Sequence, residues 1–250
     1  MTWRRRDVLG GLGALALWPG VGRALGDATH VDVAELDLGP GTTSRPQAWK
    51  RLLYHVETST SVEVLQRSVV VTPDGAELFE HPFCVLLGTG GFDAVSDKGI
   101  EQLSQFLDYG GFLFIDDTTG DDASGCDAAV RRLCSRLFPT RPLAPLPADH
   151  SVLRAFFLLD RCPGRLDRHP FLEGVTVGNL CPVVYCRNDV SGALDRTEQG
   201  MDRHPCVPGG ETQRREAVKV GINLLMYALT ANYKNDQAHV RQLMLDRRLK

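Results

Sequence analysis

The chain has 250 residues, of which 43% are hydrophobic and 24% charged, so it is long enough and apolar enough to bury a proper core. Aromatic residues make up only 7%, and the formal net charge is −3. Nucleic-acid binding requires a basic face, which this composition does not provide. We therefore expect a globular chain that binds no nucleic acid.

A basic start precedes a short apolar run at the N-terminus. Three arginines at positions 4–6 are followed by residues 8–21, a run interrupted by glycines and shorter than the roughly 20 residues of a membrane span. Arg5-Arg6-Asp7-Val8-Leu9 is similar to the twin-arginine export motif. We expect residues 1–26 to be a twin-arginine signal peptide, and the mature protein to be periplasmic or otherwise exported without a membrane span. An uncleaved anchor or a chance basic start is the alternative.

The mature chain is acidic. Residues 1–26 hold four arginines and one aspartate, so 24 basic and 30 acidic residues remain, a charge of about −6.

The seven cysteines are an odd number, so they cannot all pair. Cys126 and Cys134 would lie roughly 12 Å apart on one helix, too far for a disulfide. No pair has the short spacing of a zinc ribbon or a thioredoxin site. Only Cys162 and Cys206, both expected in loops, are candidates for a disulfide. The other five are expected to be small core residues: Cys84, Cys126, Cys134, Cys181 and Cys186.

The pattern of apolar residues predicts strand, helix and strand in the first part of the mature chain. Residues 30–36 alternate as in a strand. Ser44 followed by Gln47 is a capping-box pattern that predicts a helix start, and the next residues carry an apolar stripe on one helix face. Residues 69–71 form a short apolar strand that ends at a Pro-Asp-Gly turn.

The centre of the chain predicts a βαβ unit. Residues 83–87 are a continuous apolar run, as expected of a strand buried on both faces, and a glycine loop follows. Ser96 is the expected N-cap of a helix that ends at Gly110, and residues 112–115 form a second buried strand. A strand, crossover helix and strand in this order imply parallel pairing. The expected fold class is therefore an α/β parallel-sheet three-layer sandwich.

The remaining residues predict two further helices and one further strand. Helices are expected around residues 126–137 and 218–229, with a strand at residues 183–186 between them. Residues 187–210 show no apolar period and are expected to form a long loop. Residues 235–250 are expected to be a C-terminal tail. It could form a short basic helix that packs through Val240, Leu243 and Met244. The α/β domain itself is expected to span residues 27–234.

Polar clusters follow the expected strands at the edge where parallel α/β sheets bind ligands. Each has a structural alternative: the glycines as a tight turn, the aspartates as helix caps, and the histidine as a hydrogen-bonded structural residue. Asp116, Asp117 and His150 are the candidates for acid–base catalysis. His204-Pro205-Cys206 contains two soft metal ligands, too few to define a site, so neither a metal nor a cofactor is expected. The candidate ligand-binding residues are Gly90, Gly91, Asp116, Asp117, His150, Arg187, Asn188 and Asp189.

Several segments together resemble the bacterial family called domain of unknown function 4159, which is related in fold to the class I glutamine amidotransferases. The resemblance covers residues 30–233, and it rests on Leu87-Gly88-Thr89-Gly90-Gly91, on residues 110–117, on Asp149-His150, on Asn188-Asp189 and on residues 220–229. Members usually have Gly-His-Gly in the glycine loop, where this chain has Gly88-Thr89-Gly90, so no role of that histidine is transferred. The resemblance implies a flavodoxin-like, amidotransferase-like fold.

The resemblance also indicates which chemistry is missing. In the amidotransferases the glycine loop supplies an oxyanion-hole N–H, and the next strand ends in an elbow that bears the cysteine nucleophile. Here the elbow position falls at Asp116-Asp117, and a carboxylate cannot form the thioester that a thiolate forms. Glutamine hydrolysis is therefore not expected. The first hypothesis is an exported non-catalytic domain that binds a ligand or an envelope protein partner. The second is a periplasmic hydrolase that uses Asp/His acid–base chemistry on a glycan or a peptide.

Overall fold

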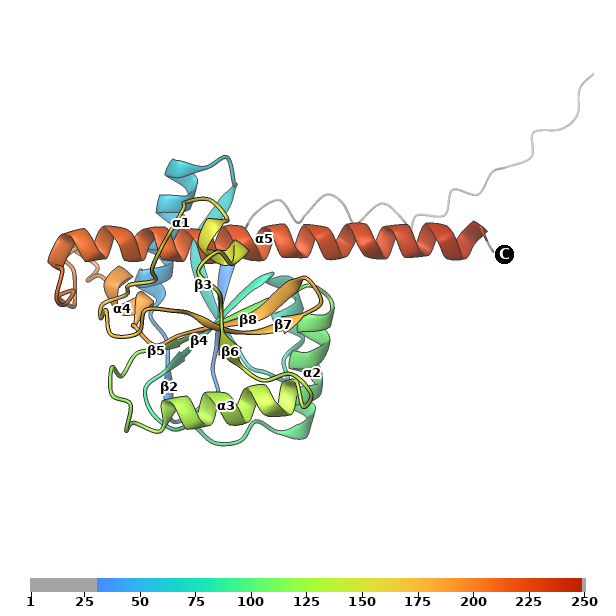
Figure 1. The fold of residues 1–250 in the computed structure, drawn as a ribbon, viewed down its shortest axis with the longest axis horizontal. Coiled ribbons are helices and arrows are strands. Elements are labelled where there is room, and N and C mark those ends of the chain that lie inside the picture. Colours follow the sequence, from blue (N-terminus) through green and yellow to red (C-terminus); the bar gives the residue numbers. More distant parts are fainter. Residues whose placement is uncertain (1–30, 249–250) are drawn as a thin grey trace, which may run out of the picture.

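A mixed sheet of eight strands runs through the centre of the computed structural model, and five α-helices surround it (Figure 1). The structure describes residues 31–248, and it describes side chains for residues 31–231. The expected signal peptide at residues 1–26 lies outside the described residues.

The strands and helices follow one another along the chain as the sequence predicts, with some additions. The strands are β1 (Val31–Leu36), β2 (Thr42–Thr43), β3 (Val64–Val71), β4 (Phe83–Gly88), β5 (Phe112–Asp117), β6 (Ala144–Pro145), β7 (Glu173–Val177) and β8 (Leu180–Cys186). The α-helices are α1 (Pro46–Ser59), α2 (Asp97–Asp108), α3 (Cys126–Leu137), α4 (Val190–Leu194) and α5 (Gly210–Arg248). Two 3₁₀ helices, η1 (Ala76–Glu80) and η2 (Ser151–Arg154), complete the set.

The sheet is parallel in its main part and antiparallel at its margins, which corrects the expectation of a wholly parallel sheet. Its order is β3-β1-β4-β5-β8-β7-β6, and the first five of these strands are mutually parallel. β7 and β6 pair antiparallel at one margin, and β2 pairs antiparallel with the end of β4. Only residues 178 and 179 separate β7 from β8, and so short a connection can join only antiparallel strands.

The βαβ unit predicted at the centre of the chain is confirmed. β4 and β5 pair in parallel from Phe83 opposite Phe112 to Gly88 opposite Asp117, and both strands are buried along their whole length. Burial on both faces explains their continuous apolar sequences. Ser96 caps α2 as predicted, because its side chain accepts a hydrogen bond of 3.0 Å from the N–H of Gly99.

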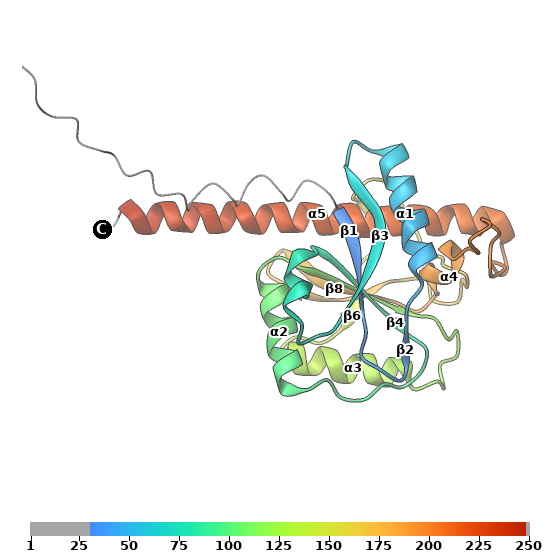
Figure 2. The same ribbon diagram turned by 180° about the vertical axis from the view of Figure 1, so that it is seen from behind.

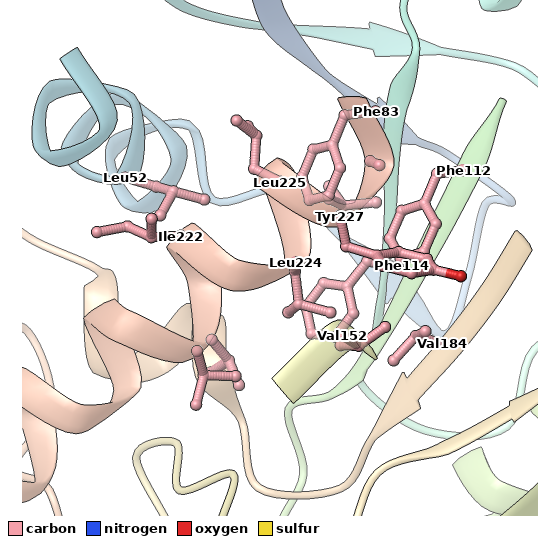
Figure 3. Packing of buried hydrophobic residues seen from close by; sticks show 14 of the residues in the cluster. Leu52, Phe83, Phe112, Phe114, Val152, Val184, Ile222, Leu224, Leu225 and Tyr227 are labelled. Carbon is pink, nitrogen blue, oxygen red and sulfur yellow. The ribbon is translucent and has the colours of Figure 1, made fainter. Parts of the chain in front are cut away.

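The helices cover both faces of the sheet (Figures 1 and 2). α1, α4, α5 and η2 contribute to one apolar cluster, whereas α2 and α3 contribute to the other. In the first cluster, the rings of Phe83, Phe112 and Phe114 from the strands lie against side chains of α5 (Figure 3). The alternation of side chains along β5 therefore assigns Phe112 and Phe114 to one face and Leu113 and Ile115 to the other.

α1 starts differently from the predicted capping box. Pro46 occupies the first turn and Arg45 is the N-cap residue, without a side-chain cap hydrogen bond. Proline favours the first helical position because its fixed φ suits the helix and its missing N–H is not needed there. The helix therefore starts at Pro46, one residue later than a cap at Ser44 would place it.

α5 is one continuous helix, which corrects the expectation of a separate tail helix. It runs from Gly210 through residues 235–248 without a break, and its last part extends past the sheet (Figure 2). Its earlier part crosses α1 at Gly221, where an added Cβ would lie 2.9 Å from Leu52 Cδ1. Glycine at this position therefore allows the two helices to approach closely.

All seven cysteines are buried free thiols. Cys162 and Cys206, the candidate pair for a disulfide, are therefore not bonded. Like the other five, each is enclosed as a small side chain, which is how free cysteine usually behaves in a core.

Candidate functional site

The polar segments that follow β4, β5 and β8 lie at one edge of the sheet, as the parallel pairing predicts. Leu87 is opposite Asp116, Gly88 is opposite Asp117, and Asp116 is also opposite Cys186. The candidate residues around these positions are therefore neighbours in space. What each side chain contacts decides what this edge can do.

Asp116 is completely buried and lies on the same face as α4. Its Oδ1 accepts the N–H of Val190 at 3.0 Å, and its Oδ2 accepts the N–H of Ser191 at 2.7 Å. Burial, together with the nearby charge of Asp189, raises the pKa of Asp116 to about 7, while the two N–H groups act in the opposite direction. Asp116 therefore ties the end of β5 to the start of α4.

Asp189 is also completely buried, and it is the centre of an ion-pair network. It has a left-handed backbone with φ of 56°, which aspartate tolerates better than most residues, and its side chain caps α4 through the N–H of Gly192 at 2.8 Å. Arg45 donates to its Oδ1 at 2.5 Å, and Arg165 donates to its Oδ2. Two guanidinium groups thus compensate the charge of one buried carboxylate.

Asp117 points to the opposite face of the sheet from Asp116, because the two residues are adjacent in a strand. Its Oδ1 accepts both the N–H of Thr119 at 2.8 Å and the hydroxyl of Thr119 at 2.6 Å, and its Oδ2 lies 3.5 Å from the Tyr185 hydroxyl. The two aspartates therefore do not form a carboxylate pair.

Cys126 lies beside Asp117, but its environment is not that of a nucleophilic thiol. It is completely buried at the start of α3, and burial first, then the neighbouring Asp117, raises the pKa of its thiol far above the usual range. A Cβ added at Gly88 would lie 2.4 Å from its Sγ, so the glycine makes room for the thiol. A reactive cysteine needs a lowered thiol pKa and access to solvent, and Cys126 has neither.

The glycine loop is joined to the start of α3. The N–H of Gly91 donates to the Ser124 carbonyl at 3.1 Å, and a Cβ at Gly90 or Gly91 would approach the carbonyl of Ser124 or Gly125. The Gly91 N–H is therefore already engaged and does not point to a ligand in this conformation. The added Cβ atoms would lie 3.7 Å and 3.6 Å from these carbonyls, which are ordinary van der Waals contacts, so packing does not require glycine at either position.

Asn188 and Arg187 bind segments of the same chain. Asn188 is completely buried, and its amide holds the loop of residues 162–169 through hydrogen bonds with Cys162, Arg168 and His169. Arg187 donates to Asp122 Oδ1 at 2.6 Å. Both residues are thus engaged in organising the edge.

His150 does not join these residues. Its Nδ1 accepts the N–H of Val152 at 3.2 Å, so it caps η2, and its ring lies 6.0 Å from that of Tyr227. Tyr227 in turn packs at 5.7 Å on Phe112, the first residue of β5. Asp116 lies four residues further along the strand, about 13 Å away at about 3.3 Å per residue. The histidine and the aspartates are therefore at opposite ends of the sheet.

Three residues that the sequence did not indicate complete the edge: Arg45, Arg165 and Ser191. Arg45 and Arg165 lie 144 and 24 positions from Asp189 along the chain, and no spacing rule connects an arginine to an aspartate at such separations. Arg45 also borders an open cleft of about 470 Å³, which is formed by residues 44–47 on one side and by Asp195, Glu198, Arg203 and His204 on the other.

The described part of the chain contains no group of three or more side chains arranged to hold a metal ion. His204 and Cys206 are therefore not part of such a group. No helix within residues 31–248 is both long and apolar enough to cross a membrane.

A comparison with models of protein families identifies the family of the chain. No characterised protein matches the chain in a search of curated sequences. The family model described as domain of unknown function, DUF4159, matches residues 32–229, which include the sheet except for Val31, the helices α1 to α4 and the first part of α5. The chain therefore belongs to the DUF4159 family.

Proposed function

We propose that the chain is an exported, non-catalytic domain that binds a ligand or an envelope protein partner. We also propose that its fold is the three-layer sandwich of the flavodoxin-like and class I amidotransferase-like proteins, without the cysteine nucleophile. The order of the five parallel strands supports this fold, because numbered along the chain among themselves they run 2-1-3-4-5, the flavodoxin-like order.

The observation that carries the non-catalytic function is the internal use of the acidic groups. Both oxygens of Asp116 accept backbone N–H groups, and both oxygens of Asp189 accept guanidinium N–H groups. A general acid or base must reach a proton of the substrate, directly or through one water. Carboxylates that are fully buried and fully hydrogen-bonded instead hold the binding surface in shape.

The environment of Cys126 supports the same proposal. In amidotransferases the thiolate stands on an exposed elbow, whereas Cys126 is enclosed between Gly88 and Asp117 with a raised thiol pKa. Incubation with glutamine should therefore release ammonia only at the background rate, and thiol alkylation should leave that rate unchanged.

The alternative, a hydrolase with Asp/His acid–base chemistry, finds less support. It requires His150 and an aspartate within reach of one substrate, whereas His150 lies beside Tyr227 at the other end of β5.

Two substitutions that remove chemistry and retain shape distinguish these functions. Asp117→Asn keeps an oxygen for Thr119, and His150→Asn keeps a side-chain acceptor for the N–H of Val152. The double variant, introduced at the native locus, should melt within a few degrees of the wild type and support the same growth phenotype as the wild type. A folded double variant that behaves like the gene deletion would favour the hydrolase.

A further inference from the structure

The loop between β5 and α3 connects two buried residues at the carboxyl edge of the sheet. It runs from Asp117, the last residue of β5, to Cys126, the first residue of α3. Its first residue is bound to β4, because the N–H and the hydroxyl of Thr118 both donate to the carbonyl of Gly88, at 2.9 Å and 2.8 Å. Residues 119–125 are all partly or fully exposed. We therefore expect movement of residues 119–125 to change the access of solvent to both buried side chains.

One exposed carboxylate, that of Asp122, holds this loop against the opposite side of the edge. Its Oδ1 lies 2.6 Å from Arg187 Nη2 and 3.4 Å from His169 Nε2, and its Oδ2 lies 3.7 Å from Arg168 Nη2. Arg168 also donates to the carbonyl of Gly120. Ion pairs of an exposed side chain are weak one by one and are screened by salt. The loop is thus held by contacts that salt or one substitution can release.

Arg187 is shared between two acids and is fully bonded to neither. Its Nη2 donates to Asp122, whereas its Nε lies 3.9 Å from Asp127 Oδ1, beyond hydrogen-bonding distance. Both Nε and this Oδ1 are buried, and neither has a hydrogen-bond partner within residues 31–231. Buried polar atoms without partners are unfavourable. A shift of the guanidinium group by about 1 Å toward α3 would join the two atoms and draw Arg187 away from Asp122.

Two glycines give the loop the backbone freedom that such a movement requires. Gly120 has a φ of 65° and Gly125 a φ of 83°, a left-handed conformation that glycine adopts without strain. Gly125 is also the N-cap residue of α3, where it forms no side-chain cap hydrogen bond. Small residues at the ends of a moving segment often absorb its change in backbone angles.

We propose that residues 119–125 form a lid, which opens when Arg187 exchanges Asp122 for Asp127 and thereby opens a path from solvent to Asp117 and Cys126. In the closed lid, Thr119 donates its N–H and its hydroxyl to Asp117 Oδ1. Opening withdraws both donors, so a buried structural carboxylate becomes an accessible one. This inference goes beyond the proposed function, and its test requires no ligand.

The test is the rate at which N-ethylmaleimide alkylates Cys126 in the folded protein, measured by mass spectrometry of its peptides. Cys134 is the internal reference, because it is buried in the same helix about two turns further on. A change from low to high sodium chloride concentration should raise the rate at Cys126 severalfold in the wild type, because salt screens the ion pairs of Asp122. The rate at Cys134 should stay unchanged.

Two neighbouring aspartates of the loop provide a variant and its matched control. Asp122→Asn removes the ion pairs at an exposed position, so it should raise the rate at Cys126 about fivefold and abolish the effect of salt. Asp121→Asn removes the same charge from the same loop, and asparagine still accepts the N–H of Ala123. Because Arg187 and Arg168 pair with Asp122 instead, Asp121→Asn should leave the rate unchanged.

The exchange of partners has a readout of its own, the Nε–H resonance of Arg187. In Asp122→Asn this resonance should move downfield, because Nε–H then donates to Asp127. Addition of Asp127→Ala removes that acceptor and should reverse the shift.

Equal rates at Cys126 in the wild type, Asp122→Asn and Asp121→Asn would overturn the proposal. An equal rise at Cys126 and Cys134 would also overturn it, because α3 would then unfold as a whole, and so would an Arg187 resonance that Asp122→Asn leaves in place. The salt series on the wild type decides the question even if Asp122→Asn does not fold. The non-catalytic function is tested separately, by the Asp117→Asn and His150→Asn double variant, so the two proposals can fail independently.

Discussion

At the scale of single residues, the structure distinguishes two aspartates that are adjacent in sequence. Asp116 accepts a backbone N–H on each oxygen, so an amide in its place would turn an NH₂ group toward one of these donors. One buried N–H would then lack a partner, which costs about 1–3 kcal/mol. We expect Asp116→Asn to lower the free energy of unfolding by this amount in urea denaturation.

The neighbouring position supplies the control. Asp117→Asn keeps the acceptor for Thr119 and places an NH₂ group near the Tyr185 hydroxyl, which can accept its hydrogen bond. Its free energy of unfolding should therefore fall by less than that of Asp116→Asn. Equal losses in the two variants would contradict the contrast between the two environments.

Asp116 should also affect how the free energy of unfolding changes with pH. Burial and Asp189 raise its pKa from 3.8 in an ordinary aspartate to about 7 in the folded protein. Between these values the folded protein keeps a proton that the unfolded chain releases, so the contribution of Asp116 to stability is full below pH 4 and is lost as the pH rises through 7.

The measurement is a series of urea denaturations between pH 4 and pH 8. The decline of stability with pH should be smaller in Asp116→Asn than in the wild type. An identical slope in the two proteins would show that Asp116 titrates in its ordinary range.

At the scale of secondary-structure elements, the end of β4 lies in close contact with the start of α3. A Cβ at Gly88 would lie 2.4 Å from Cys126 Sγ, so Gly88→Ala forces α3 away from β4. Overpacking of this kind costs about 1–3 kcal/mol. We expect the melting temperature of Gly88→Ala to fall accordingly.

The double-mutant cycle with Cys126→Ala tests the cause. Removal of the sulfur makes room for the new methyl group, so Gly88→Ala should cost much less in the Cys126→Ala background than in the wild type. The two changes should therefore be strongly non-additive. Additive losses would indicate that glycine is required at position 88 for its backbone and not for this contact.

The same elements show what a sequence can predict. β4, α2 and β5 were predictable because a buried strand is continuously apolar, and because Ser96 and Gly110 mark the ends of the helix between the strands. β7 was missed although Val175 and Val177 alternate along it, since five residues after a long irregular segment carry a weak signal. The continuity of α5 through residues 235–248 agrees with the sequence, because no glycine or proline in residues 222–248 marks a place where the helix should stop.

The candidate site was predictable in its location but not in its contacts. Parallel pairing alone brings Gly88, Asp116 and Asp189 to one edge. The arginines that bind Asp189 come from distant loops, and His150 was placed beside the aspartates because the chain position of a loop does not reveal which end of the sheet it covers.

At the scale of the whole molecule, the remaining prediction concerns export. Residues 4–6 are arginines that precede a short apolar run, and Arg5-Arg6 matches the paired arginines of the export motif. Arg5→Lys together with Arg6→Lys keeps both positive charges and removes only the planar guanidinium groups, which lysine does not replace. We expect the double variant to remain uncleaved in the cytoplasm, as measured by cell fractionation and by the mass of the purified chain. Arg23→Lys is the matched control, since it makes the same chemical change outside the pair and should leave export and cleavage intact. None of these substitutions alters residues 31–231. If the variants have equal melting temperatures, a difference in location is therefore due to the paired arginines. Cleavage and secretion of the Arg5/Arg6 variant at the rate of the wild type would contradict the twin-arginine assignment. The proposal that the domain is exported by this route would then fail.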